Sequence, residues 1–397
     1  MSSYISLFCG CGGFDYGFSH HFECLGAYDY EKTAVDTFKE NLSDKVFLHD
    51  LSDINLPNLH EAKQAEILLA GSPCQGFSTV GLRKFDDPRN ALIYKAAEIA
   101  GVVNPKVVIC ENVPAVKSGK HAAYWNNLIS KFEGLGYHTE EFLYDLSKYG
   151  LAQTRKRLFL IAYKGERVDR AHLELEESGE LNLGGVLDGV EGVSDHSVNG
   201  FVRDIDKEIA SKIAPGQKLS NVRGGVNAVA TWHIPQVYGH ITDSEQELLE
   251  HIRALRRRYR VRKSGDADPV SSELLRKYHG ESYKKDLISL ISKGYVVEKG
   301  HELFDLKGTF NGKYRRLRLD KPSYTVDTNF GNPRYFIHPV EDRGFSVREA
   351  ARIQGFPDSF VFKGGIAHQY RMVGNAVPPV ISRKIASKIS KVFFDQG

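Results

Sequence analysis

Cys74 stands in a segment whose residue types suit a nucleophile. The run Gly71-Ser-Pro-Cys-Gln-Gly-Phe-Ser78 follows the apolar stretch Glu66–Ala70 and consists mainly of polar and turn-forming residues. Pro73 fixes the backbone ahead of the cysteine. A thiol in such surroundings is accessible, whereas a structural cysteine usually lies inside an apolar run, as Cys110 does. The pattern predicts a nucleophilic Cys74, with an inert loop thiol as the alternative.

A carboxylate and two guanidinium groups lie at the ends of other apolar stretches. Glu111-Asn-Val113 directly follows Lys106–Cys110, and Gln153-Thr-Arg155-Lys-Arg157 leads into the apolar run Arg157–Tyr163. A positioned carboxyl group can transfer a proton, and a guanidinium offers planar donors to a base carbonyl or a phosphate. We expect these groups to face the same cleft as Cys74. For the arginines, the alternative is a surface charge run.

A glycine turn and two acidic residues indicate a nucleoside cofactor. Phe8-Cys-Gly-Cys-Gly-Gly13 joins the apolar run Ile5–Phe8 to a helical stretch, and such turns allow the backbone to approach a ligand closely. Asp29 follows the next apolar stretch, where a carboxylate can accept from ribose hydroxyls. Tyr30 can stack on an adenine, and Asp50 can accept from its amino group. Each feature alone also fits a tight turn, a solvated acid or a core aromatic.

These candidates lie between alternating strands and helices. The apolar runs predict strands at residues 5–8, 66–70, 106–110 and 157–163, and amphipathic stretches predict helices at 34–41 and 92–103. Such alternation implies an α/β fold with a mostly parallel sheet and helices on both faces. Ligands of such sheets lie beyond the carboxyl ends of the strands, which is where the candidate residues fall.

Composition narrows the class of protein. A chain of 397 residues exceeds one hydrophobic core, so we expect two domains. The net charge of +3 is too small to indicate a nucleic-acid partner by itself. Five scattered cysteines favour a reducing compartment, and no second pair at zinc spacing follows Cys9-x-Cys11, so no metal is expected. Because we see neither signal-peptide features nor an apolar run of membrane-spanning length, the sequence predicts a cytosolic protein.

The character of the chain changes near residue 164. Residues 171–202 contain seven acidic residues and no Lys or Arg, which indicates an irregular connector. The segment Arg253–Lys263 contains seven basic residues and no acid, and Lys313–Arg318 forms a second basic cluster. From about Phe345 the α/β character returns, and the final helix is expected at Val380–Phe394.

The motifs, taken in order, resemble those of the cytosine-5 DNA methyltransferase family over nearly the whole chain. Two further motifs complete the set, Arg348-Glu-Ala-Ala-Arg-Ile-Gln-Gly-Phe-Pro357 and Gly374-Asn-Ala-Val-Pro-Pro379. One motif alone is modest evidence, but the full set in family order is specific. Three departures are small: Asp29 replaces a usual Glu, Ala152 a frequent Pro, and Ala376 a common Ser.

The resemblance implies a Rossmann-like, S-adenosylmethionine-dependent methyltransferase domain and a smaller target-recognition domain. The implied reaction transfers a methyl group to carbon 5 of a cytosine flipped out of double-stranded DNA, through a covalent Cys74 adduct, with S-adenosylhomocysteine as product and no metal. The implied catalytic residues are Cys74, Glu111, Arg155 and Arg157. The implied cofactor-binding residues are Phe8, Gly10, Cys11, Gly12, Gly13, Asp29, Tyr30, Asp50, Leu51, Pro73, Leu92, Asn375 and Ala376. The implied base-pocket and DNA residues are Ser72, Gln75, Ser78, Asn112, Val113, Gln153, Arg253, Arg256, Arg257 and Arg258.

The same resemblance suggests domain bounds and partners. It places a catalytic, cofactor-binding domain at 1–163, a target-recognition domain at 164–344, a hinge and return segment at 345–369, and a C-terminal motif and helix at 370–397. Within the second region, Arg253–Lys263 is the candidate phosphate contact. An exposed helix face stabilised by upstream acids is the alternative. The expected partner is double-stranded DNA; a cognate restriction endonuclease without a stable complex and a monomeric state are further expectations, as is the bacterial cytosol as location.

Three other functions remain as alternatives. A tRNA cytosine methyltransferase is the nearest, and the long region 164–344 favours DNA over it. A DNA-binding protein without catalysis is disfavoured because Cys74, Glu111 and Arg157 occur together. A cysteine hydrolase would need a base for Cys74, and none of the fifteen histidines is placed beside that residue in the sequence.

Overall fold

The structure is a computed structural model that describes residues 2–73, 87–193, 195–198, 200–222, 225–263 and 267–395. It divides into two compact units. The first unit contains residues 1–197, 319–329 and 347–397, and the second contains residues 198–318 and 330–346. The second unit overlaps the expected 164–344 region but is smaller, and its assignment to target recognition stays a prediction.

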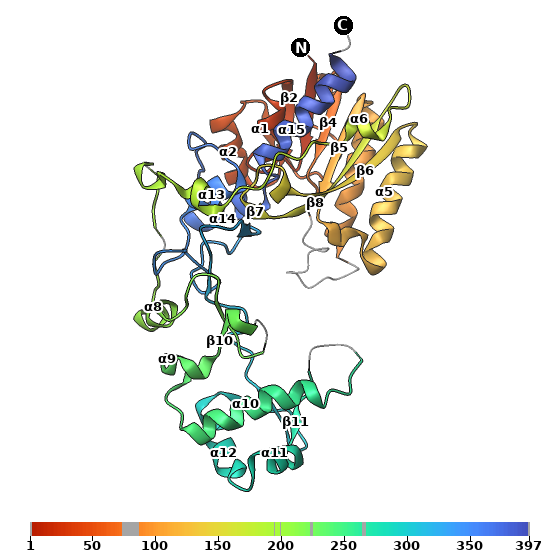
Figure 1. Cartoon of the computed structure of the whole chain (residues 1–397). Coiled ribbons are helices and arrows are strands. Elements are labelled where there is room, and N and C mark those ends of the chain that lie inside the picture. Colours follow the sequence, from red (N-terminus) through yellow and green to blue (C-terminus); the bar gives the residue numbers. More distant parts are fainter. Residues whose placement is uncertain are drawn as a thin grey trace. The chain divides into compact units, whose positions relative to one another are not determined.

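A seven-stranded sheet forms the centre of the first unit (Figure 1). Its spatial order is β3-β2-β1-β4-β5-β8-β6. The strands are β1 (Ser3–Leu7), β2 (Glu23–Asp29), β3 (Val46–Leu48), β4 (Ile67–Ala70), β5 (Val107–Asn112), β6 (His138–Asp145) and β8 (Lys156–Tyr163). The five neighbouring strands β3, β2, β1, β4 and β5 are parallel to one another. Strand β8 runs antiparallel to both β5 and β6. The predicted α/β fold with a mostly parallel sheet is confirmed.

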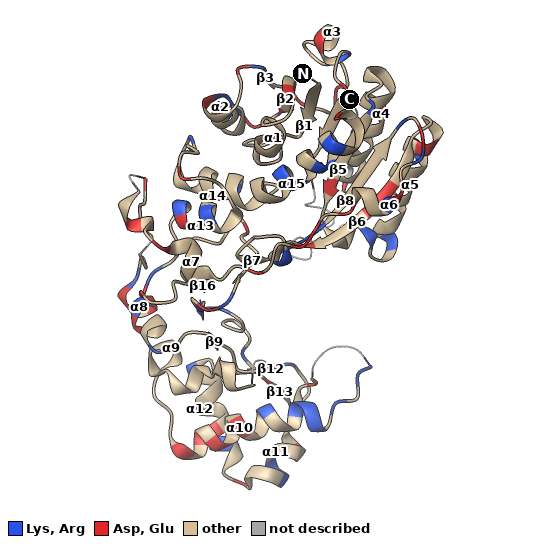
Figure 2. Ribbon diagram, turned by 45° about the horizontal axis from the view of Figure 1, so that its top comes forward, with Lys and Arg blue, Asp and Glu red and all other residues tan. Residues whose placement is uncertain are grey.

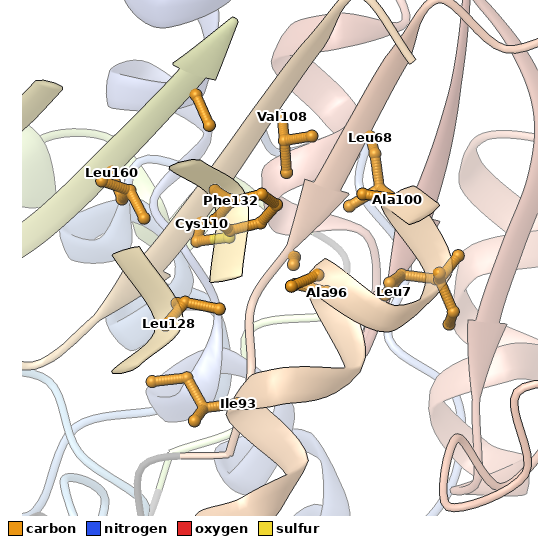
Figure 3. Packing of buried hydrophobic residues seen from close by; sticks show 14 of the residues in the cluster. Leu7, Leu68, Ile93, Ala96, Ala100, Val108, Cys110, Leu128, Phe132 and Leu160 are labelled. Atoms are coloured by element: carbon orange, nitrogen blue, oxygen red, sulfur yellow. The ribbon is translucent and has the colours of Figure 1, made fainter. Parts of the chain in front are cut away.

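Helices cover both faces of this sheet. On one face, α4 (Lys95–Val103) and α5 (Ala122–Gly134) pack against side chains such as Leu68 and Val108, as Figure 3 shows. On the other, α1 (Gly13–Phe18) and α15 (Pro379–Ile389) pack against their strand neighbours. Strands buried on both faces need continuous apolar runs, and every residue of β1, β4 and β5 is buried.

Several predicted elements differ in their ends. The helix expected at 92–103 begins as a 3-10 helix, Pro88–Tyr94, and becomes α-helical only at Lys95. The strand expected at 106–110 continues to Asn112, so Glu111 lies within β5 rather than after it. The last helix ends at Ile389, and a π-helical turn spans Ser390–Phe394. The helix expected at 34–41 is α2 (Lys32–Asn41).

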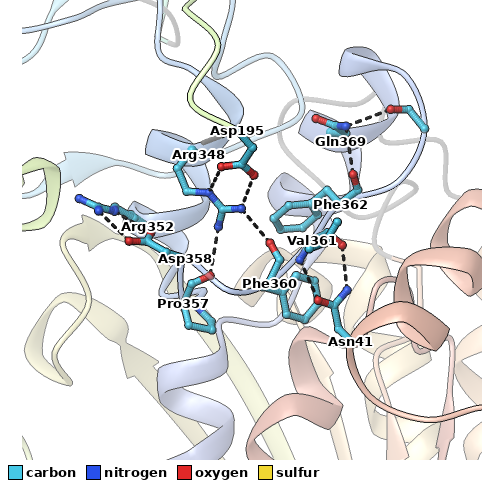
Figure 4. Close-up of polar contacts among 11 residues, drawn as sticks. Asn41, Asp195, Arg348, Arg352, Pro357, Asp358, Phe360, Val361, Phe362 and Gln369 are labelled. Atoms are coloured by element: carbon cyan, nitrogen blue, oxygen red, sulfur yellow. Dashed lines mark hydrogen bonds and ion pairs between the residues drawn. The ribbon is translucent and has the colours of Figure 1, made fainter. Parts of the chain in front are cut away.

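The return segment of the first unit contains α13 (Val347–Gln354) and α14 (Ile366–Asn375). The Arg348 side chain is buried within this segment, with an exposed fraction of 1%. Its guanidinium donates to Asp195 Oδ1 at 2.8 Å, to the Pro357 carbonyl at 3.1 Å and to the Phe360 carbonyl at 2.8 Å (Figure 4). A buried guanidinium must be satisfied in this way, so Arg348 fixes the fold of this segment.

Short elements complete the first unit. They are α3 (Leu59–Ala62), α6 (Arg170–Leu173), α7 (Leu183–Leu187) and the parallel pair of β7 (Gln153–Thr154) and β15 (Ser323–Tyr324). The connector expected at 171–202 therefore carries short helical turns.

The second unit is mainly helical. Its longest helix, α10 (Asp243–Arg258), starts with a capping box in which Thr242 and Glu245 bond reciprocally. Its other elements are α8 (Asp204–Ser211), α9 (Pro235–Tyr238), α11 (Ser272–His279), α12 (Tyr283–Lys293), β9 (Lys218–Leu219), β10 (Ala228–Val229), β11 (Val270–Ser271), β12 (Val296–Glu298), β13 (Leu303–Leu306), β14 (Arg315–Arg316) and β16 (Phe336–Ile337). Trp232, Leu249 and Ile252 belong to one buried core in this unit.

None of the helices in the described ranges combines the length and apolar character needed to cross a lipid bilayer.

The packing of α1 on α15 makes the first testable prediction. A Cβ atom at Gly17 would lie 2.2 Å from the Arg383 backbone nitrogen and 2.3 Å from the Ser382 carbonyl carbon. We expect Gly17→Ala to lower the free energy of unfolding by about 1–3 kcal/mol or more, because backbone must move. Gly101→Ala on α4 is the matched control: its nearest neighbour would be 3.5 Å away, and it should stabilise by about 0.5–1 kcal/mol. Guanidinium unfolding curves measure both; equal effects would contradict the packing argument.

Candidate active site

The carboxyl ends of five parallel strands lie in one row along the sheet. In spatial order, Asp50 follows β3, Asp29 ends β2, the glycine turn 8–13 follows β1, residues 71–73 follow β4, and Glu111 lies near the end of β5. Neighbouring strands are about 4.8 Å apart. The strand order therefore puts the predicted cofactor residues on one side of segment 71–73 and Glu111 on the other.

Asp29 and the glycine turn hold each other. The Gly10 N–H donates to Asp29 Oδ2 at 2.9 Å, and the Glu31 N–H donates to Oδ1 at 2.9 Å. Burial raises the pKa of Asp29, which is 8% exposed, while the two backbone donors act in the opposite direction. At Gly10, no heavy atom lies within 4 Å of the position a Cβ would take. The turn thus borders open space beside a fixed carboxylate, which suits a nucleoside ligand.

Gly12 and Gly13 are required by packing. Gly12 has φ +91°, and a Cβ there would lie 2.3 Å from Leu42 Cδ1. A Cβ at Gly13 would lie 2.5 Å from the Val377 carbonyl oxygen and 2.9 Å from Ala376 Cβ. The close approach at Gly13 brings the motif Gly374–Pro379 against the turn, although the two are more than 360 residues apart in the chain.

The other predicted cofactor residues differ in exposure. Tyr30 is 66% exposed, whereas Leu51 is 3% exposed and belongs to the core. Asp50 is exposed, and the pKa of its carboxyl is lowered chiefly because the Ser52 N–H donates to it at 2.9 Å. Phe8, Pro73, Leu92 and Ala376 are half-buried, Cys11 is buried, and Asn375 is exposed. The burial of Leu51 leaves its side chain little surface for a ligand.

Glu111 and Arg157 form a mostly buried ion pair. Arg157 Nε lies 2.7 Å from Glu111 Oε1, and the two side chains are 12% and 11% exposed. The antiparallel register of β5 and β8 pairs Asn112 with Leu158, which brings the two side chains together from neighbouring strands. Burial raises the pKa of Glu111, and Arg157 opposes the rise. This carboxyl therefore keeps its proton to a higher pH than an exposed glutamate does.

Asn112 ties the ends of β4 and β5. Its Nδ2 donates to Ser72 Oγ at 3.1 Å, and its Oδ1 accepts from the Val113 N–H at 2.8 Å. Asn112 and Ser72 are buried and Val113 is half-buried. The Asn112 side chain therefore holds the end of β5 and the segment after β4 together. Cys74, Gln75 and Ser78 lie outside the described residues.

Arg155 and Gln153 hold the return segment rather than lining open space. Arg155 is 1% exposed; its Nη1 donates to the Val326 carbonyl at 3.0 Å, and its Nη2 donates to the Gly374 and Ala376 carbonyls, each at 3.2 Å. Gln153 is buried, donates to Gln354 Oε1 at 2.6 Å and accepts from the Val326 N–H at 3.0 Å. These contacts favour positioning roles over the substrate contacts predicted for them.

The basic run of the second unit is only partly available to a ligand. Arg256 is paired with Asp305, the two side chains being 12% and 17% exposed, and Arg257 Nη2 donates to the Val222 carbonyl at 2.6 Å. Arg253 pairs with Glu250. Arg258 lies near the rings of two tyrosines. Arg256 is thus part of the scaffold.

Two residues of the same unit with polar side-chain groups, Trp232 and Asn221, lie in its interior. Trp232 is 4% exposed, and Asn221 is 1% exposed. The Asn221 side chain accepts from the Thr231 N–H at 2.8 Å and donates to the Lys307 carbonyl at 3.2 Å. Their polar groups are used to stabilise the fold.

Cys9, Cys11, Cys24 and Cys110 are free thiols. Within the described ranges, no group of three or more His, Cys, Asp or Glu side chains is arranged to hold a metal ion.

Comparison with known protein families matches residues 2–391 to the family described as C-5 cytosine-specific DNA methylase. The chain belongs to this family. It is 31% identical to the Type II methyltransferase M.AgeI of Thalassovita gelatinovora, over 97% of this chain and 98% of that protein. It is 28% identical to the Type II methyltransferase M.NgoFVII of Neisseria gonorrhoeae, over 98% of this chain and 87% of that one.

Solved structures show the same fold. A prophage-encoded protein of E. coli matches with a TM-score of 0.61 at 21% identity, over 98% of this chain and 99% of that one. The Entamoeba histolytica methyltransferase EhMeth matches with a TM-score of 0.57 at 13% identity, over 98% of each chain. The family recognised from the ordered motifs, and the enzyme class with it, are confirmed.

Sequence reasoning missed one ionisable residue of this methyltransferase. Asp15, in the first turn of α1, is fully buried; its Oδ2 accepts from Ser6 Oγ at 3.0 Å, and its Oδ1 has no hydrogen-bond partner among the described residues. Burial raises the pKa of Asp15 from 3.8 to about 7. Its position two residues after Gly13 could have marked Asp15 as a candidate residue of the glycine turn. The sequence does not show that its carboxylate points into the interior.

The raised pKa makes a pH prediction. Below pH 3.8 Asp15 is protonated in both the folded and the unfolded protein, so its ionisation does not affect the free energy of unfolding. As the pH rises, Asp15 loses its proton first in the unfolded protein, so the free energy of unfolding falls until about pH 7. We expect the free energy of unfolding of Asp15→Asn, relative to that of the wild type, to increase by up to about 1.4 kcal/mol per pH unit over this window. Unfolding curves from pH 4 to 8 measure the difference, with the exposed Asp36→Asn as control. A difference independent of pH would contradict a raised pKa.

Proposed function

We propose that this methyltransferase transfers a methyl group from S-adenosylmethionine to carbon 5 of a cytosine flipped out of double-stranded DNA, through a covalent Cys74 adduct. One observation carries the proposal: the Asn112–Ser72 bond ties the segment that leads to Cys74 to the strand end that holds the Glu111–Arg157 pair. Cys74 is the second residue after Ser72. The glycine turn adjoins the same segment, since the Gly71 N–H donates to the Leu7 carbonyl at 3.2 Å.

The chemistry needs a nucleophile and a proton donor on one base. Carbon 5 of cytosine is a weak nucleophile, and covalent addition at carbon 6 activates it. In the proposed sequence the Cys74 thiolate bonds to carbon 6 while protonated Glu111 donates to ring nitrogen 3. After carbon 5 has gained the methyl group it loses its proton to a base, and the Cys74–carbon 6 bond breaks to restore the aromatic ring. Arg157 holds Glu111 in place and lies near the base carbonyl.

The glycine turn and Asp29 fit the cofactor. The open space at Gly10 and the buried Asp29 carboxylate, whose oxygens each have a second lone pair, suit the ribose hydroxyls of a nucleoside. The exposed ring of Tyr30 suits stacking on adenine. S-adenosylmethionine, when bound, supplies the methyl group as an electrophile. The chain's own contribution is to hold it beside segment 71–73.

DNA is the proposed duplex substrate, with the second unit as the reader of its sequence. A base inside a stacked duplex cannot reach a pocket of this kind, so the target must leave the stack. Three exposed cations of the basic run, Arg253, Arg257 and Arg258, are proposed to contact phosphates, which position the protein without reading sequence. Arg256 is left out of this proposal because its side chain is mostly buried and paired with Asp305.

The relatives named Type II methyltransferases support a role in a restriction–modification system. There the chain would protect host DNA from a cognate endonuclease, with which it needs no stable complex. A monomeric state and the bacterial cytosol as location complete this proposal.

The covalent step predicts a trapped complex. Fluorine at carbon 5 cannot leave as a proton does, so DNA with a 5-fluorocytosine target should give a denaturation-resistant adduct in the presence of S-adenosylmethionine. Peptide mapping by mass spectrometry should place the adduct on Cys74. Cys74→Ser should give none, and tRNA with the same base should stay free. An adduct on another residue would overturn the assignment of the nucleophile.

The Glu111–Arg157 pair predicts a pH profile. Because the protonated form of Glu111 is the active one, the single-turnover rate should fall as the pH rises through its pKa. Arg157→Gln removes the larger of the two arginine charges that lower this pKa, so the fall should move to higher pH. Glu111→Gln should lose about 100-fold or more in rate and show no such limb. An unshifted limb in Arg157→Gln would show that the ion pair does not control the proton donor.

A further inference from the structure

A hollow of about 730 Å³ lies in the first unit, on the face of the sheet covered by α1 and α15. Its lining comes from α1, from the segment around residues 175–186, and from α13, α15 and the residues next to them. None of the residues predicted to bind cofactor, cytosine or target DNA is among them. The volume is in the range of small-ligand sites, so the hollow needs an account separate from the methylation site.

The floor of the hollow is apolar and includes an aromatic ring. Tyr16, Val186, Pro357 and Val380 line it, and each is half-buried, so each keeps apolar surface for a ligand. The Tyr16 ring is flanked by the Arg383 guanidinium, which lies 5.9 Å from the ring centroid. An apolar floor with a ring and a guanidinium favours a flat ring system.

The rim of the hollow is cationic. Lys384, Lys388 and Lys391 follow one another at spacings of four and three residues, which places them on one side of α15 and its last turn. Figure 2 marks the Lys and Arg positions of α15 in blue. Within the described part of the chain these three ammonium groups make no ion pair or hydrogen bond, although Lys384 and Lys388 are half-buried. Lysines held together without counter-charges repel one another, and an anionic ligand would relieve this.

Other charged groups of the lining do not neutralise the row. Arg352 is already paired with Asp358, its Nη2 lying 2.7 Å from Asp358 Oδ2. Arg383 contacts His20 Nε2 at 3.3 Å and adds a further cation. Glu176 is the one carboxylate among the lining residues, and it is exposed. The hollow thus keeps an excess of positive charge over an apolar floor.

We propose that this hollow binds a nucleoside di- or triphosphate, with the base on the floor beside Tyr16 and the phosphates along Lys384, Lys388 and Lys391. Three lysines within two helical turns match a chain of linked phosphates, because each ammonium can donate to a different phosphoryl group. The apolar floor distinguishes this ligand from inorganic polyphosphate, which has no ring to place there.

Isothermal titration calorimetry of the full chain with uridine triphosphate tests the proposal. Saturating S-adenosylhomocysteine should be present, so that the cofactor pocket is filled, and a pyrimidine probe avoids competition for it. We expect saturable binding at one site. Lys384→Glu/Lys388→Glu should weaken it by about tenfold or more, because two attractive charges become repulsive. Lys39→Glu/Lys63→Glu, with the same change in net charge at exposed positions outside the hollow, should bind as the wild type does.

Ligand fragments and activity separate the outcomes. Uridine and tripolyphosphate should each bind more weakly than uridine triphosphate, and Lys384→Glu/Lys388→Glu should keep its circular dichroism spectrum and its DNA methylation rate. Equal binding of tripolyphosphate would reject the base contact. Absence of nucleotide binding at millimolar concentration would reject the site. If the double variant weakens only the binding of a DNA duplex, the lysine row is a DNA contact and the nucleotide proposal is wrong.

Discussion

The pairing order of the buried strands is the constraint on which the site depends. Strands β2, β1, β4 and β5 are adjacent and parallel, so their carboxyl ends meet along one edge. A slip of one residue would turn every side chain of the strand to the opposite face, and because helices pack against both faces, side chains of the wrong size would meet each core. Since β1, β4 and β5 are buried throughout, hydrophobic packing fixes the relative positions of Asp29, segment 71–73 and Glu111.

Electrostatics at this edge follows from the same burial. A carboxyl group inside the sheet is costly to ionise, and the pKa of Glu111 rises for that reason, while Arg157 from the neighbouring antiparallel strand limits the rise. The antiparallel direction of β8 matters, because it places the first residues of β8, including Arg157, beside the carboxyl end of β5. The first residues of a parallel strand would lie at the opposite edge of the sheet, away from Glu111. Arg155, two residues earlier, uses its guanidinium to anchor Gly374 and Ala376 against the glycine turn. One short segment thus supports the acid and secures the return of the chain.

Much of the fold could be predicted from the sequence, because parallel buried strands leave a clear signal of short apolar runs. The strands near residues 5, 67, 108 and 158 were found in this way, and ordered motifs identified the family. The roles of single residues were harder. Arg155 and Gln153 look like ligand-binding groups in a polar motif, but their burial depends on Val326 and on residues from 353 to 376, which no local pattern reveals. For the same reason the interior position of Asp15 and the core position of Leu51 could not be read from the chain alone.

The most direct test of the account is a crystal structure of the full chain trapped on duplex DNA that contains 5-fluorocytosine. We expect the sulfur of Cys74 bonded to carbon 6 of an extrahelical base, and a Glu111 carboxyl oxygen within hydrogen-bond distance of ring nitrogen 3. The glycine turn should contact the cofactor product on the side of segment 71–73 opposite to Glu111. A covalent bond from Cys74 to a base that Glu111 does not reach, or a cofactor bound away from the turn, would contradict the account.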